Sequence, residues 1–177
     1  MGDSLITVIA IFLAAVLMFV FPLVTVSDRN DDIAQLTVQS DTTAFVDEVR
    51  FTGKMSEANY GKFVQKLGAT GNSYDVEIEW KVKDENAGKK SAQANSEKIG
   101  ENYYYSKFTS QIMEEFEKNN GSIILKEGDI ISVKVKNTNQ TIAQSLKNFF
   151  YGITGNDTAQ IEARHSGVVT TTGTNRK

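Results

Sequence analysis

Few residues of this chain have the types and spacings that catalysis needs. His165 is the only histidine, and there is no cysteine. A lone histidine cannot pair with a cysteine nucleophile, and Gly-x-Ser-x-Gly, phosphate-loop and His-Glu-x-x-His motifs are all absent. We therefore predict no enzyme activity, no catalytic residue, no cofactor and no small-molecule substrate. We interpret His165 as a structural residue within a strand.

One acidic group raises the question of a cation, namely Asp28, Asp31 and Asp32. Carboxylates are the oxygen ligands that hard cations prefer, but such a group is more often solvated surface, and we predict no metal site. Acids and bases are otherwise interspersed, with 19 Lys and Arg against 22 Asp and Glu. Because no basic face stands out, we predict no nucleic-acid partner.

The residues from Leu5 to Val26 form an apolar stretch without a charge. A helix of about 22 residues spans about 33 Å, enough to cross a hydrocarbon layer of roughly 30 Å. The residues before it include Asp3 and no base, unlike a cleaved signal peptide, which is the alternative reading. We therefore predict a retained transmembrane anchor at 1–27. Its candidate membrane and assembly residues are Leu5, Ile9, Phe12, Val16, Phe19, Pro22 and Val26.

The helix is predicted to continue beyond the anchor as an amphipathic segment at 28–53. Ala34, Val38, Phe45 and Val49 fall on one face at helical spacing, and Gly53 is the expected stop. Pro22 is expected to kink the helix, because its ring clashes with the carbonyl four residues earlier. The apolar face of the second segment should therefore pack against a head domain.

That head is predicted at 54–171, followed by a polar tail at 172–177. Ser56 should cap a short helix that buries Phe63 and Leu67, and the alternation from Tyr74 to Lys83 predicts a strand with Trp80 in the core. A mobile loop is expected at 84–101. Val38, Phe45, Val49, Phe63, Leu67 and Trp80 are the predicted contacts between helix and head.

The rest of the head alternates between helical and strand patterns. We predict a helix at 102–119, a short strand at 123–125, a strand around 131–135, a helix capped by Thr138 or Asn139, and a strand at 159–166. The predicted fold class is α+β. A long N-terminal transmembrane and amphipathic helix packs on a small antiparallel sheet with two or three short helices.

This layout resembles that of type IV pilin-like proteins. Residues 34–53 look like the post-membrane helix of TadE-like minor pilins. Residues 73–80 and 129–146 are similar to an uncharacterised family of small Firmicute membrane proteins associated with Tad pilus or conjugation loci. The resemblance implies a cell membrane protein with an extracytoplasmic domain, or a subunit of a bacterial cell-surface filament. One departure is Thr7, which stands where pilins usually carry a glutamate.

Two functions follow from these expectations. The first is a structural subunit of a pilus-like filament or a secretion or conjugation apparatus. Its apolar helix would contact membrane lipid and other copies, giving a homo-oligomer, or other subunits. The alternative is a single-pass membrane protein that does not polymerise and whose extracytoplasmic domain binds a partner in such an apparatus.

Overall fold

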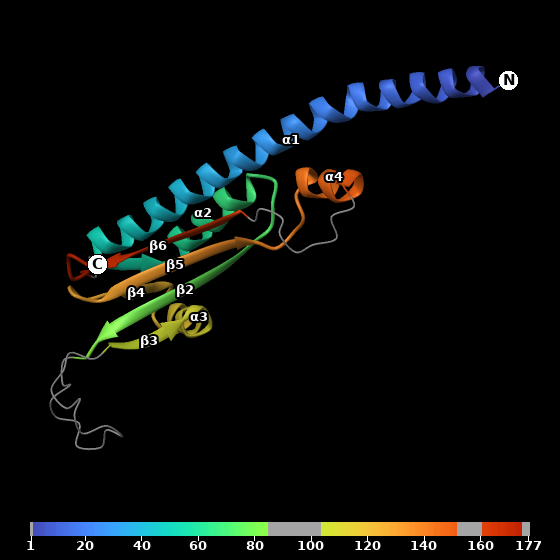
Figure 1. Ribbon diagram of the computed structural model, residues 1–177. Coiled ribbons are helices and arrows are strands. Elements are labelled where there is room, and N and C mark those ends of the chain that lie inside the picture. Colours follow the sequence, from blue (N-terminus) through green and yellow to red (C-terminus); the bar gives the residue numbers. More distant parts are fainter. Residues whose placement is uncertain (1, 85–103, 152–160, 175–177) are drawn as a thin grey trace, which may run out of the picture.

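The computed structural model describes residues 2–84, 104–151 and 161–174. The fold is α+β, with a long apolar N-terminal helix on small antiparallel sheets and a few short helices. Figure 1 shows the helix as a rod, one half of which lies along the head while the other projects beyond it. The predicted loop at 84–101 lies, beyond Asp84, outside the described residues.

Helix α1 runs without interruption from Gly2 to Thr52. Its 51 residues would extend about 75 Å at 1.5 Å per residue. It ends where predicted, because Gly53 adopts a left-handed conformation with φ of 60° while its N–H still donates to the carbonyl of Val49 at 2.9 Å. A Cβ at position 53 would lie 2.0 Å from the carbonyl oxygen of Thr171, so only glycine fits this turn.

The helix passes through Pro22 as a continuous ribbon, gently curved rather than broken (Figure 1). A proline inside a helix removes one N–H donor, which leaves the carbonyl of Met18 without its usual partner four residues on. The expected kink is therefore not seen at Pro22, and α1 curves gently instead.

Two antiparallel sheets form the head. The larger has the order β3–β2–β5–β6, and β1 pairs with β4 in the smaller. The strand bounds are β1 Lys54–Ser56, β2 Tyr74–Lys83, β3 Tyr104–Phe108, β4 Ser122–Ile124, β5 Ile130–Asn137 and β6 Glu162–Val168. Strand β2 has the bounds that its alternating sequence predicts.

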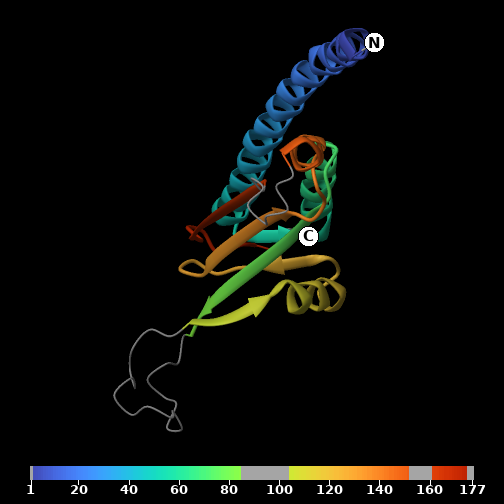
Figure 2. The same cartoon turned by 45° about the vertical axis from the view of Figure 1, so that its right-hand side comes forward.

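Strand register separates an apolar face from a charged face. Ile78 lies opposite Val133, and Val133 lies opposite His165, so these three share the face that α1 covers. On the other face, Glu77 lies opposite Lys134 and Lys134 opposite Arg164. One side of the sheet therefore faces the core and the other faces solvent. Figure 2 shows α1 crossing the head beside β6 and β5.

In the described part of the head, the short helices are α2 Glu57–Gly68, α3 Thr109–Lys118 and α4 Ile142–Tyr151. The hydroxyl of Ser56 accepts from the N–H of Asn59 at 3.2 Å, which confirms Ser56 as the N-cap of α2. Phe63 of α2 stacks on Phe45 of α1 with ring centroids 4.6 Å apart. Val64 is exposed, and Ala69 caps the end of α2.

The prediction of one helix from 102 to 119 is wrong in its first part. Tyr104–Phe108 form strand β3, and the helix begins only at Thr109. Tyr105 and Phe108 do stand at helical spacing from Ile112, but β3 pairs with the edge of β2, with Lys83 opposite Tyr104. This pairing is non-local, and it overrides the local pattern.

Two further boundaries differ from those predicted. Thr141, not Thr138 or Asn139, caps α4: its hydroxyl accepts from the N–H of Gln144 at 3.2 Å, and the Gln144 side chain accepts from the N–H of Thr141 at 3.1 Å. The first residues of the predicted polar tail are bonded to the head, since the N–H of Gly173 donates to the carbonyl of Leu125 at 3.1 Å. Residues 175–177 lie outside the described chain.

Candidate functional site

The first half of α1 presents its apolar side chains outward. The residues predicted there are mostly exposed, from 52% for Ile9 to 76% for Phe19. Pro22 is exposed as well, and Val16 is half-buried. Among the described residues, α1 is the one helix long and apolar enough to cross a membrane, and none of its most apolar window is buried. This is compatible with membrane anchoring.

An exposed apolar surface of this length is unusual in water. Soluble monomers rarely expose contiguous apolar patches larger than a few hundred Å². Here Phe12, Met18 and Phe19 are each more than two-thirds exposed. Water is therefore an unfavourable environment for this half of the helix.

Two alanines interrupt this bulky surface one helical turn apart. Ala10 and Ala14 are both exposed and lie four residues apart, which places them on the same side of α1. Small residues at this spacing allow two helix backbones to approach closely in a membrane. Phe12 projects from the opposite side of the helix.

The second half of α1 belongs to the core of the head. Burial begins at Ser27, which is 8% exposed, immediately after the exposed Val26. The six predicted helix–head residues, Val38, Phe45, Val49, Phe63, Leu67 and Trp80, all lie in one hydrophobic cluster, none more than 6% exposed. The head and this half of the helix therefore form one packed unit.

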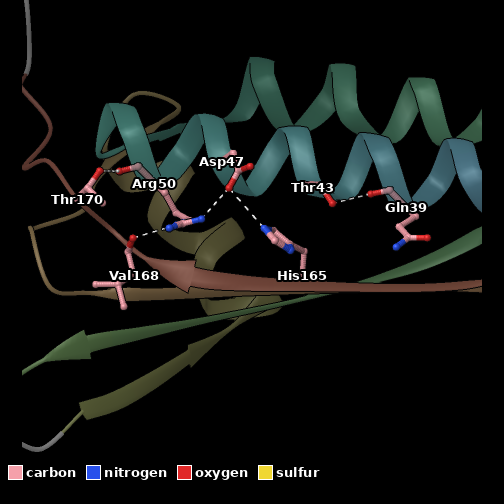
Figure 3. A network of polar contacts seen from close by, with 7 residues as sticks. All are labelled: Gln39, Thr43, Asp47, Arg50, His165, Val168 and Thr170. Carbon is pink, nitrogen blue, oxygen red and sulfur yellow. Dashed lines mark hydrogen bonds and ion pairs between the residues drawn. The ribbon is translucent and has the colours of Figure 1, made fainter.

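Polar contacts fix α1 to the last strand (Figure 3). Arg50 Nη1 contacts Asp47 Oδ1 at 2.8 Å, and Arg50 Nε donates to the carbonyl of Val168 at 3.0 Å. His165 Nε2 lies 3.4 Å from the same Asp47 oxygen, and the N–H of Thr170 donates to the carbonyl of Arg50 at 3.0 Å. The single histidine thus takes part in a tether between helix and sheet.

A second tether lies at the start of β6, the edge strand of the larger sheet. Gln35 Nε2 donates to the carbonyl of Glu162 at 2.7 Å, and Gln35 Oε1 accepts from the N–H of Glu162 at 3.0 Å. Side chains of α1 therefore occupy backbone groups at both ends of this edge. Such cover limits pairing of an edge strand with another chain.

The acidic group Asp28, Asp31 and Asp32 does not converge on one point. Asp28 Oδ1 lies 2.6 Å from Lys147 Nζ, while Asp31 Oδ2 accepts from the Thr141 hydroxyl at 2.5 Å. Asp32 is exposed. Within residues 2–84, 104–151 and 161–174, no group of three or more His, Cys, Asp or Glu side chains is arranged to hold a metal.

One buried carboxylate was not singled out by the sequence. Asp129 is 1% exposed and accepts from Trp80 Nε1 at 3.0 Å, the N–H of Lys83 at 2.9 Å and the N–H of Lys126 at 3.0 Å. These contacts join β2 to the turn before β5. Asp129 ends a Lys-Glu-Gly-Asp turn, and aspartates in turns often accept hydrogen bonds from nearby backbone N–H groups. This turn sequence was the signal that could have identified Asp129 as a structural residue.

Within the part of the chain that the structure describes, Tyr60 of α2 has a pKa clearly displaced from its ordinary value. Burial raises the pKa of the Tyr60 phenol above its ordinary value of 10.0, and the negative charge of Asp75 adds to the effect. The ring packs edge-on against Phe45 at 6.4 Å. Tyr60 is therefore neutral near pH 7 and packs against α1.

The solvent face of the sheet contains a shallow concavity of about 510 Å³. Its lining includes acids and bases, among them Glu77, Lys134 and Arg164, together with Phe108, which is 57% exposed. Lys134 lies 3.9 Å from Glu77, within ion-pair distance. Charged and aromatic side chains therefore lie together on this open surface.

Comparison with protein-family models, with curated proteins and with solved structures gives no match for this chain. Its function must therefore be inferred from its own surfaces.

Proposed function

We propose that this protein is a pilin-like structural subunit of a surface filament or of a secretion or conjugation apparatus, anchored and assembled through the first half of α1. The observation that supports this proposal is the division of one continuous helix. Its apolar first half is outside the head, while its second half is part of the head's core. The head would lie on the extracytoplasmic side of a bacterial membrane.

Lipid insertion of the exposed half is strongly favourable. Residues 5–26 include fifteen Leu, Ile, Val or Phe side chains. At about −0.3 to −0.6 kcal/mol each near the membrane centre, they contribute roughly −5 to −9 kcal/mol. The two threonines in this half satisfy their hydroxyls within the helix, as Thr7 Oγ1 donates to the carbonyl of Asp3 at 2.8 Å and Thr25 Oγ1 to that of Phe21 at 3.0 Å.

Assembly would then depend on packing, since lipid is as apolar as leucine. Helices in a membrane associate through close van der Waals contact, which small residues promote. We place Ala10 and Ala14 at the contact between copies and Phe12 on the side away from it. The rigid junction between α1 and the head would carry the head along with each added copy.

The absence of cysteine allows a clean test of this assembly. Full-length Ala14→Cys and Phe12→Cys chains in membranes should differ, with disulfide-linked dimers forming readily at position 14 and poorly at position 12. The double variant Ala10→Leu/Ala14→Leu keeps the helix apolar but blocks close approach. It should insert normally and lose its oligomers, whereas Phe12→Leu should keep them. Equal cross-linking at both positions, or normal oligomers from the double variant, would count against assembly through this face.

The second candidate is a membrane-anchored protein that does not polymerise and uses its head to bind a partner. The concavity that contains Phe108, Glu77 and Arg164 on the open sheet face favours it. Electron microscopy of material sheared from the cell surface separates the two candidates. Filaments labelled by an antibody against the head support the first, and unassembled protein retained in the membrane supports the second.

A further inference from the structure

Helix α4 is attached to α1 next to the place where the exposed apolar half ends. Lys147 Nζ lies 2.6 Å from Asp28 Oδ1, and the Thr141 hydroxyl donates to Asp31 Oδ2 at 2.5 Å. These aspartates follow Val26 by two and five residues, which is about 3 to 8 Å along the helix axis. If residues 5–26 occupy the hydrocarbon layer, α4 is held at the level of the lipid headgroups.

The exposed side of α4 carries two large apolar side chains beside one serine. Ala143 and Gln144 are 2% and 6% exposed and fix the helix to the head. Ile142, Ser145 and Phe149 are exposed at i, i+3 and i+7, on one side of the helix. Ile142 is 69% and Phe149 is 79% exposed, so two large apolar side chains of this ten-residue helix are mostly accessible.

We infer that α4 is an interfacial helix that rests on the membrane surface, with Ile142 and Phe149 in the boundary between headgroups and acyl chains. The inference rests on the proposed anchoring of α1, because that places lipid next to α4. Amphipathic helices of this kind bury their apolar face about 5–10 Å into this boundary. Lys147 flanks the stripe and directs its ammonium group to Asp28 of α1.

Lipid fits this stripe better than a second protein does. Two such side chains offer on the order of 300 Å² of apolar surface, below the roughly 800 Å² per partner of a stable protein interface. The Asp28 and Asp31 contacts of α4 also hold the stripe close to the end of the apolar half of α1. The head would thereby have two points of contact with the membrane, which fixes its tilt.

The test measures the depth of single positions in the full-length chain. Ile142→Cys and Phe149→Cys are labelled with an environment-sensitive fluorophore in phosphatidylcholine vesicles that contain at most about one copy each. Val8→Cys, on the exposed half of α1, is the control expected inside the hydrocarbon layer, and Phe108→Cys, on the open sheet face, is the control expected in water. Matched vesicles include lipids that carry a quencher near the headgroup, and the loss of fluorescence relative to vesicles without the quencher is measured.

Labels at 142 and 149 are expected to lose most of their fluorescence to the headgroup-level quencher. The Val8 label should instead be quenched by lipids that carry the quencher deeper in the acyl chains. The Phe108 label should keep its fluorescence with both kinds of lipid. A label at 142 that behaves like the one at 108, with Val8 still quenched, would overturn the interfacial position of α4 alone. The measurement is repeated in vesicles that contain many copies. If the label at 142 lies in an apolar environment only in those vesicles, the stripe contacts a second copy, and the inference is overturned. A Val8 label in water would overturn the proposed anchoring as well.

Discussion

Gly167 leaves room for the side chain of Arg50 to cross the last strand. A Cβ at position 167 would lie 2.3 Å from Arg50 Nε and 2.5 Å from Arg50 Cζ. Because Arg50 is held by Asp47 and by the carbonyl of Val168, it cannot move aside without losing those contacts. The tether between helix and sheet therefore depends on a glycine that has no unusual backbone angle.

Gly167→Ala is expected to lower the free energy of unfolding by about 1–3 kcal/mol, the usual cost of overpacking. Gly61→Ala is the matched control: nothing lies within 4 Å of its Cβ, so it should stabilise α2 by about 0.5–1 kcal/mol. Denaturant unfolding followed by the fluorescence of Trp80, the only tryptophan, measures both. If Gly167→Ala costs as much in an Arg50→Ala background as it does alone, the clash is not with Arg50.

Asp129→Ala should be among the most damaging single changes in the head. It would leave three N–H donors, including Trp80 Nε1, without their acceptor. Each unsatisfied buried donor costs about 1–3 kcal/mol, so we expect a loss of more than about 3 kcal/mol. Asp129→Asn keeps one acceptor oxygen and should lose less. A loss below about 1 kcal/mol for the alanine variant would show that water replaces the carboxylate at little cost.

Tyr60 gives the protein an alkaline limit. In the unfolded chain a tyrosine ionises near its ordinary pKa of 10.0, whereas burial and Asp75 raise the pKa of Tyr60 in the folded state. As pH rises above 10, the unfolded state releases a proton that the folded state keeps, so stability falls. Tyr60→Phe removes this proton and should decline less steeply between pH 10 and 11. Parallel curves for the two proteins in this range would contradict this assignment.

At the scale of elements, the helices and strands that could be predicted are those specified by a pattern within their own residues. The strand Tyr74–Lys83 and the long helix were predicted with their bounds, because alternation over ten residues and apolar spacing over fifty are strong local patterns. Strand β3 was missed because its five residues are fixed by pairing with β2. The three-residue strand β1 depends in the same way on β4.

The start of α4 is a different kind of miss, because the signal was present. Thr141 and Gln144 have the spacing of a capping box, and the structure uses them as one. Among the candidate site residues, the head-facing set could be predicted from periodicity. The contacts of His165 with Asp47 and of Asp28 with Lys147 could not, because each joins segments more than a hundred residues apart in the chain.

The two halves of α1 should be separable by truncation. A chain of residues 28–177 retains every buried apolar residue of the core cluster and should be soluble, with the circular dichroism of a folded α+β domain. A chain of residues 43–177 lacks Ala34, Val38 and the Gln35 tether, and should not fold cooperatively. Aggregation of the 28–177 chain would mean that the head needs the first half of the helix.

At the scale of the whole molecule, the proposed chain consists of a lipid-embedded rod and a head fixed to the end of that rod. The head is joined to the rod by a shared core and by the Gln35 and Arg50 tethers, so it cannot swing freely. The orientation of the head on a membrane would then follow from the position of α1 and from α4 at its base. This arrangement suits a subunit whose copies must present their heads in a regular array.

The most direct test is the intact mass of the mature protein recovered from membranes after an alkaline wash, which removes peripheral proteins. We predict that the protein stays in the washed membrane fraction and that its mass includes residues 5–26. Recovery of the mature protein as a freely soluble monomer that begins beyond Val26 would contradict the account.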